Sequence, residues 1–140
     1  MNKKVSDIMT RDVYTLSEND TISTAAQIMK SEDIGFIPIL RDRTLIGVVT
    51  DRDLVIRGYA KGYNADTKLK DVMTSSCVTV KSDASISDAA DIMAEKQLRR
   101  LCVTDNSGEL AGICAIGDIS ISRYGKEEAG QALSEISQPN

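Results

Sequence analysis

The side chains best suited to chemistry lie in one short polar run. Thr50-Asp51-Arg52-Asp53 directly follows the apolar stretch Gly47 to Val49, a pattern typical of a strand that ends where a helix begins. Unbonded backbone N–H groups at a helix start favour an anion, and the Thr50 hydroxyl can donate to a phosphate oxygen. Asp53 falls on the same side one turn later, where its carboxylate can accept both ribose hydroxyls. The run therefore suits the phosphate and sugar of one nucleotide.

The same run has a purely structural interpretation. Thr50, followed three residues later by Asp53, is close to a capping box, in which a polar N-cap and an acid at N3 bond each other's backbone N–H groups. Taken alone, this spacing favours the cap. One pair of side chains can serve both purposes, so both interpretations stay open.

An internal repeat duplicates this part of the chain. A shift of 64 residues aligns Asp7-Ile8-Met9-Thr10 with Asp71-Val72-Met73-Thr74. One extra residue near Gly108 raises the shift to 65. At that shift Leu45, Gly47 and Asp53 match Leu110, Gly112 and Asp118. Matches of this density indicate two copies of one structural unit.

The second copy of the polar run differs in chemistry. It reads Gly112-Ile113-Cys114-Ala115-Ile116-Gly117-Asp118, so that Ala115 stands where the first copy has Thr50. An alanine side chain can neither cap a helix nor bond a phosphate, whereas Asp118 keeps the carboxylate. We therefore expect two unequal sites, of which the one at Thr50 and Asp53 is the stronger.

Each repeat predicts the order strand, helix, strand, strand, helix. Apolar residues at i, i+3, i+4 and i+7 from Ile22, and again from Ile86, predict a helix after the first strand, with Thr21 and Ser85 as N-caps. A second helix is expected to begin near Asp51 and near Ile116. The predicted strands are Val13 to Leu16, Phe36 to Leu40, Leu45 to Thr50, Cys77 to Val80, Leu101 to Thr104 and Leu110 to Ala115.

The predicted fold is therefore α/β (α+β), made of two β-α-β-β-α units. We expect the first unit at residues 5–60, a linker at 61–68, the second unit at 69–124 and a tail at 125–140 that could form a short helix. A unit of roughly 55 residues buries too little surface to be stable alone. The two units are therefore expected to pack sheet to sheet with pseudo-twofold symmetry.

Composition argues against catalysis and metal binding. The chain has no histidine, which removes the commonest general base and metal ligand. Cys77, Cys102 and Cys114 lie 25 and 12 residues apart, which is not a zinc spacing. A glycine-rich phosphate loop and a nucleophile elbow are also missing. We expect neither an enzyme nor a metal site.

Charge and hydropathy narrow the class further. A net charge of −4 and only 4% aromatic residues argue against a nucleic-acid partner, because nucleic-acid-binding surfaces are basic and carry stacking aromatics. No apolar run reaches membrane-spanning length, so no membrane role is expected and the cytoplasm is the default location.

The tandem units resemble a pair of cystathionine β-synthase (CBS) domains, often called a Bateman module, over roughly Val5 to Tyr124. The resemblance rests on Val5-Ser6-Asp7-Ile8-Met9-Thr10, which recurs as Leu69-Lys70-Asp71-Val72-Met73-Thr74, and on Gly47-Val48-Val49-Thr50-Asp51-Arg52-Asp53. The last run is similar to the family pattern of glycine, two apolar residues, Ser or Thr, two variable residues and Asp. Two ordered copies at the expected spacing make the resemblance specific.

The resemblance implies a regulatory function. Such pairs commonly bind AMP, ADP or ATP in a cleft between the units, with S-adenosylmethionine and NAD-type molecules as lesser alternatives here. They usually form homodimers and regulate another protein, whose identity the sequence does not reveal. A structural scaffold with no ligand is the alternative function.

The resemblance also adds residues to the expected ligand site. It places Ile37 and Pro38 near the adenine, and Val78 and Thr79 along the same cleft as Thr50 and Asp53. Arg100, with Arg99 second, is expected to reach the phosphates; a solvated pair of charges near Glu95 is the alternative. Thr15 and Asp118 would belong to the weaker second site.

Overall fold

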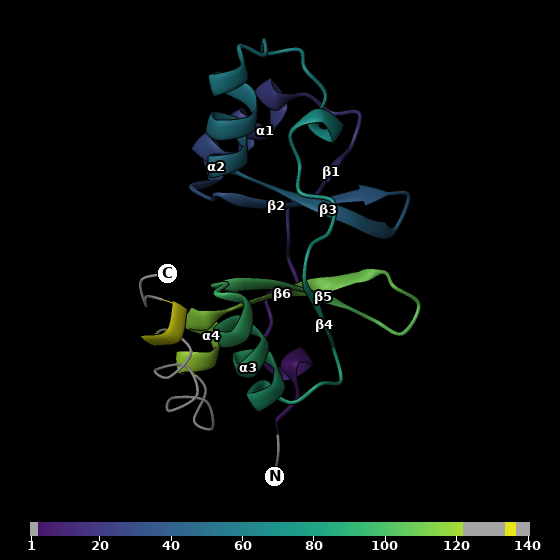
Figure 1. The fold of residues 1–140 in the computed structure, drawn as a ribbon. Coiled ribbons are helices and arrows are strands. Elements are labelled where there is room, and N and C mark those ends of the chain that lie inside the picture. The colour runs from purple at the N-terminus through teal and green to yellow at the C-terminus, as the bar shows by residue number, and fades with distance from the viewer. Residues whose placement is uncertain (1–2, 122–133, 137–140) are drawn as a thin grey trace. The chain divides into compact units, whose positions relative to one another are not determined.

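The computed structural model describes residues 3–121 and 134–136. The first repeat contributes β1 (Leu16–Ser17), α1 (Ile22–Glu32), β2 (Phe36–Arg41), β3 (Thr44–Thr50) and α2 (Asp51–Asp53). The second contributes β4 (Thr79–Lys81), α3 (Ile86–Lys96), β5 (Arg100–Thr104), β6 (Leu110–Ala115) and α4 (Ile116–Ile121). The predicted order of elements is confirmed in both repeats (Figure 1).

Each repeat forms a three-stranded sheet in the described residues. β1 pairs parallel to β2, and β2 pairs antiparallel to β3; β4, β5 and β6 repeat this arrangement. Within each unit the helices cover one face of the sheet (Figure 1). The mixed α/β class is thus confirmed, while sheet-to-sheet packing of the two units stays a prediction.

The first strand of each repeat begins later than predicted. Val13 to Leu16 was expected, but the ladder holds only Leu16 and Ser17, and the other first strand begins at Thr79 rather than Cys77. The ladder joins Leu16 to Ile39 and Ser17 to Leu40, and no pairing with β2 is found for the described residues before Leu16. These residues instead carry the chain from one compact unit to the other.

The long helices begin and pack as the sequence predicts. The Thr21 hydroxyl accepts from the backbone N–H of Thr24 at 3.2 Å, and the Ser85 hydroxyl accepts from that of Asp88 at 3.0 Å. Ala25 on α1 is fully buried, as is its counterpart on α3, because a methyl side chain lets each helix lie close to its sheet.

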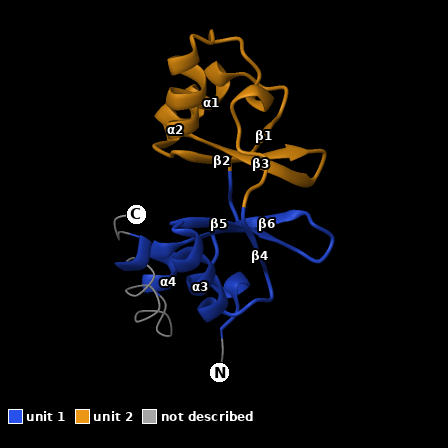
Figure 2. Ribbon diagram, viewed as in Figure 1, with its two compact units in different colours: residues 1–13, 78–140 blue, residues 14–77 orange. Residues whose placement is uncertain are grey.

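The chain divides into two compact units that differ from the sequence repeats. One, the middle unit, consists of residues 14–77; the other, the terminal unit, consists of residues 1–13 and 78–140 (Figure 2). Residues 61–68, expected as a linker, lie inside the middle unit, where Lys68 bridges to Thr21. The chain passes between units at 13/14 and 77/78 instead.

This division arises because the repeats exchange their first segments. Val5, at the start of the first repeat, is buried in the core of the terminal unit, and its N–H donates to the carbonyl of Ala84 at 2.8 Å. Leu69, its counterpart, is buried in the core of the middle unit and donates to the carbonyl of Asp20 at 2.8 Å. Each repeat therefore completes the other's core.

Only part of the predicted tail is described. Ser134, Glu135 and Ile136 are helical, Ile136 packs against the core of the terminal unit, and the side-chain amide of Gln97 donates to the Glu135 carbonyl at 3.4 Å. The rest of 125–140 lies outside the described residues. Among the helices of the described ranges, none is both long and apolar enough to cross a membrane.

Candidate ligand site

Thr50 and Asp53 form the capping box that their spacing permits. β3 ends at Thr50 and α2 begins at the next residue. The Thr50 hydroxyl oxygen accepts from the Asp53 N–H at 3.1 Å, and Asp53 Oδ2 accepts from the Thr50 N–H at 3.0 Å. The two side chains that could bind a nucleotide are therefore held in fixed positions by the helix start itself.

The box leaves part of each side chain for other partners. In the box the Thr50 hydroxyl acts as an acceptor, through a lone pair of its oxygen. Within the described part of the chain we find no hydrogen bond that the hydroxyl donates. Among the described residues, the polar contacts of the other carboxylate oxygen of Asp53, Oδ1, are long: 3.5 Å to the Thr74 hydroxyl and 3.8 Å to Arg57 Nε. One donor and one acceptor thus lie three residues apart at the same junction.

Asp53 is the more enclosed of the two residues. Its exposed fraction is 9%, and Thr50 is half-buried. A buried carboxylate needs polar partners; the Thr50 N–H and the Thr74 hydroxyl supply hydrogen bonds, and Arg57 supplies an ion pair. The carboxylate is therefore fully explained as a structural group, and its ligand-binding role stays a prediction.

Arg57 and Thr74 were not recognised in the sequence as parts of this site. Arg57 lies four residues after Asp53, within a π-helical turn (Leu54–Gly58) that continues α2. Thr74 closes the repeated Asp-x-Met-Thr motif, and its backbone pairs with Val48 of β3 in both directions, at 2.8 and 2.9 Å. The i, i+4 spacing could have suggested Arg57; nothing local connects Thr74 with Asp53.

The second junction keeps half of this arrangement. Asp118 Oδ2 accepts from the Ala115 N–H at 2.9 Å, as Asp53 does from Thr50. Ala115 has no hydroxyl to accept a hydrogen bond from the Asp118 N–H, so only one of the two bonds of a capping box is formed. The predicted inequality of the two junctions is visible in their hydrogen bonds, although ligand binding at either one stays a prediction.

The pKa of Cys114, beside this junction, makes a pH effect testable. Burial, together with the neighbouring Asp118, raises the pKa of the Cys114 thiol from 9.0 to about 12. Above pH 9 the unfolded thiol loses its proton while the folded one keeps it, so the unfolded state binds fewer protons. The contribution of the thiol to the free energy of unfolding is complete below pH 9. It is lost as pH rises towards 12, by at most about 1.4 kcal/mol per pH unit.

We expect Cys114→Val to flatten this decline, because valine is the residue at the matching position 49 of the first repeat. Urea unfolding between pH 8 and 10.5 measures the slope in both proteins. Equal slopes would contradict the assignment of the alkaline decline to Cys114.

The remaining predicted site residues divide between the two units. Ile37 packs in the core of the middle unit, and Pro38 is also fully buried. Successive strand residues face opposite sides of a sheet, so these two side chains do not share a face. Packing accounts for both, and their contact with an adenine stays a prediction. Thr15 is exposed, just before β1.

Arg99, Arg100, Val78 and Thr79 belong to the terminal unit. Arg100 is the first residue of β5, where it lies opposite Ala115, and its side chain is exposed. The Arg99 carbonyl accepts from the Ile116 N–H at 2.9 Å. Thr79 is exposed at the start of β4, and Val78 packs against the core. The expected reach of Arg100 to the ligand of Thr50 and Asp53 stays a prediction.

The position of Arg99 in the repeat lies next to the strand–helix junction of its own unit. Its counterpart in the first repeat is Gly35, whose added Cβ would lie 2.8 Å from an Asp51 carboxylate oxygen. In the second repeat Ile116 replaces Asp51. A side chain at position 35 would require the exposed Asp51 carboxylate to shift, whereas the second repeat accommodates Arg99 at the matching position.

Comparison with known proteins places this arrangement in a family. The model of the CBS domain matches residues 5–58 and again residues 69–122. The CBS domain-containing protein YhcV of Bacillus subtilis is 40% identical over 136 residues, which cover 97% of this chain and 96% of that protein. Hypoxic response protein 1 of Mycobacterium tuberculosis is 38% identical over 116 residues, covering 81% and 80%.

Two solved structures extend the similarity. Hypoxic Response Protein I with two coordinated zinc ions matches at a TM-score of 0.77 and 36% identity, covering 85% of this chain and 98% of the other. CBSX2 in complex with AMP matches at 0.74 and 26%, covering 96% and 98%. In the described residues of this chain no three His, Cys, Asp or Glu side chains come together. The expectation that it binds no metal stays a prediction.

Proposed function

Because the chain belongs to the CBS domain family and carries two of these domains in tandem, we propose that it is a non-catalytic regulatory module. It binds an adenosine-containing ligand at the Thr50/Asp53 junction and passes the occupancy of that site to a partner protein. AMP is the first ligand to test, because the similar protein CBSX2 was solved with AMP. ADP and ATP follow, then S-adenosylmethionine and NAD.

The observation that carries this proposal is the chemistry left over at the capping box. The Thr50 hydroxyl can donate to a phosphate oxygen, and Asp53 Oδ1 can accept from a ribose hydroxyl. Both groups are held by backbone hydrogen bonds before a ligand arrives, so little side-chain entropy is lost on binding. Arg100, Arg99, Val78 and Thr79 are proposed to complete the contacts.

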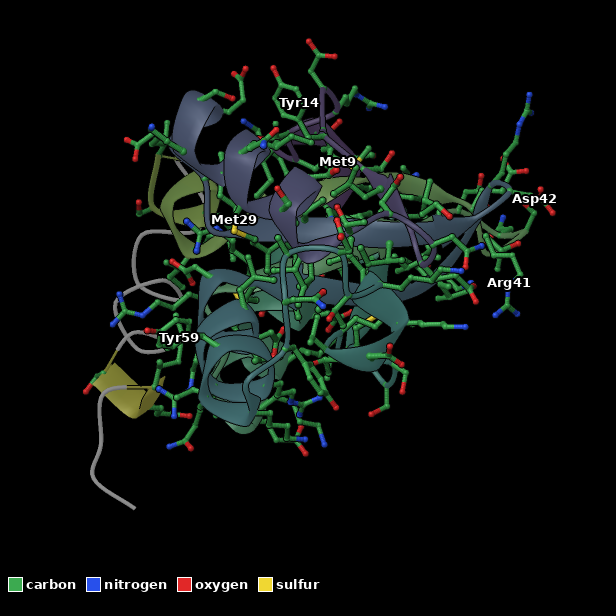
Figure 3. All side chains as sticks on the ribbon, turned by 90° about the horizontal axis from the view of Figure 1, so that it is seen from above. Met9, Tyr14, Met29, Arg41, Asp42 and Tyr59 are labelled. Atoms are coloured by element: carbon green, nitrogen blue, oxygen red, sulfur yellow. The ribbon has the colours of Figure 1, made fainter. Side chains whose placement is uncertain are left out.

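Homodimerisation through the helices is part of the proposal. Val55, Ile56 and Tyr59 leave large apolar side chains exposed on the helical segment after β3 (Tyr59 is labelled in Figure 3). Ile121 is exposed at the repeat position that matches Ile56. Apolar side chains that recur at matching positions suit a self-complementary surface between two copies.

A scaffold that binds no ligand is the alternative, favoured by the observation that the Asp53 carboxylate already has protein partners. Substitutions at positions 50 and 115, which distinguish the two junctions, decide between these functions. We expect saturating AMP, at one hundred times its Kd, to stabilise the native state by about 2.7 kcal/mol. Thr50→Ala should lose most of this stabilisation, whereas Ala115→Thr should keep it.

Thermal unfolding with and without AMP measures the effect. Each variant serves as its own ligand-free reference, because Thr50→Ala also costs about 1 kcal/mol through the lost N-cap. Stabilisation of Thr50→Ala equal to that of the wild type would remove Thr50 from the site. No stabilisation of the wild type by any adenosine compound would leave the scaffold function.

A further inference from the structure

The Asp53 carboxylate connects three segments of the middle unit. Oδ2 accepts from the Thr50 N–H at the end of β3, at 3.0 Å. Oδ1 faces Thr74, from the first segment of the second repeat, at 3.5 Å, and Arg57, from the π-helical turn, at 3.8 Å. The two oxygens therefore differ: Oδ2 is hydrogen-bonded to the backbone at the helix start, and Oδ1 contacts side chains from two other segments.

Arg57 ties the same peptide a second time. Its Nη1 donates to the Met73 carbonyl at 3.2 Å, next to the residue whose hydroxyl faces Asp53. The segment at 73–74 is thus held by the side chains of Arg57 and Asp53. It is also held by the two backbone hydrogen bonds between Thr74 and Val48. Three residues after Thr74 the chain leaves the middle unit.

The second junction has no matching connection in the residues that the structure describes. Thr10 pairs with Ile113 through the backbone, at 2.8 and 2.9 Å, just as Thr74 pairs with Val48. Yet Asp118 has its bond to Ala115, and no hydrogen bond between Thr10 and Asp118 is found over 3–121. Thr10 is therefore a matched position with the same backbone pairing.

We infer that Arg57 and Thr74 are positioning residues for Asp53 and that they couple its ligand-facing oxygen to the peptide at 73–74. The coupling rests on the proposed function, because a ligand hydroxyl is its trigger. The two contacts to Oδ1 are long compared with the 3.0 Å bond at Oδ2. A ribose hydroxyl at ordinary hydrogen-bond distance competes for the same lone pairs and loosens the hold on Thr74.

Amide exchange without ligand tests the positioning role. We expect Arg57→Gln and Thr74→Val to lower the protection of the Thr74 and Val48 N–H groups about fivefold, and Thr74→Ser to restore it. Thr10→Val should leave the Thr10 and Ile113 amides unchanged, and Arg43→Gln, at the exposed tip of the β2–β3 hairpin, controls for loss of charge. Unchanged protection in both Arg57→Gln and Thr74→Val would overturn the inference, whether or not any ligand binds.

Amide exchange with AMP tests the coupling. In the wild type we expect AMP to speed exchange of the Thr74 N–H by a fewfold, and the Arg57→Gln/Thr74→Val double variant to abolish this change. AMP binding that leaves Thr74 exchange unaltered or slower in the wild type would overturn the coupling. A wild type that fails to bind AMP, measured separately by calorimetry, counts against the proposed function, while the ligand-free comparison still decides the positioning role.

Discussion

Gly47→Ala is expected to lower the free energy of unfolding of the protein by about 3 kcal/mol. A Cβ at position 47 would lie 2.5 Å from the Thr74 carbonyl oxygen, far inside van der Waals contact. The strand and the 73–75 backbone would have to separate, which weakens the pair of hydrogen bonds between Val48 and Thr74. The clash is with backbone, so no side-chain rotation relieves it.

Urea unfolding of two further glycine variants controls this prediction. Gly112 faces the Thr10 carbonyl at the same 2.5 Å, so Gly112→Ala should cost a similar amount in the terminal unit. Gly117 on α4 has nothing within 4 Å of its added Cβ, and Gly117→Ala should be neutral or stabilising by up to about 1 kcal/mol. A Gly47→Ala protein as stable as Gly117→Ala would show that the close approach at Thr74 does not constrain the fold.

Asp53→Ala is expected to combine a stability loss with the loss of AMP binding. Without the carboxylate the Thr50 N–H loses its acceptor, and Arg57 and Thr74 lose a partner, at a cost of about 1–2 kcal/mol in ligand-free protein. Removal of a charged acceptor for the ribose should weaken AMP at least about tenfold. Isothermal calorimetry at a temperature where the variant is folded measures the affinity.

Asp118→Ala is the matched control for this change. It also removes an acceptor from a backbone N–H at a strand–helix junction, that of Ala115. We therefore expect an equal or smaller loss of stability, with AMP affinity close to that of the wild type. If Asp53→Ala bound AMP as tightly as Asp118→Ala, Asp53 would be a capping residue alone.

Much of the fold could be predicted from the sequence because the repeat shows every pattern twice. The two hairpins, the long helices and their N-caps at Thr21 and Ser85 depend on residues close together in sequence, and the structure confirms them. The exchange of the first segments could not be predicted. Val5 and Leu69 occupy equivalent positions in the repeat, so no local pattern states which unit each completes.

The candidate site shows the same division. Thr50 and Asp53 could be found because the capping box and the proposed ligand site require the same spacing. Thr74 could not, because it is 21 residues from Asp53 and reaches it only through pairing with β3. The π-helical turn that carries Arg57 could not be predicted either, because the run from Leu54 to Gly58 has no local pattern that distinguishes it from an ordinary helical turn.

Calorimetric titration of the wild-type protein with AMP tests the central claim most directly. If the junction of β3 and α2 is a ligand site, one AMP per chain should bind in the main transition, because Ala115 leaves the second junction without a hydroxyl. Binding should be tighter than in Thr50→Ala. No heat of binding with AMP, ADP or ATP, or equal affinity in Thr50→Ala, would contradict the account.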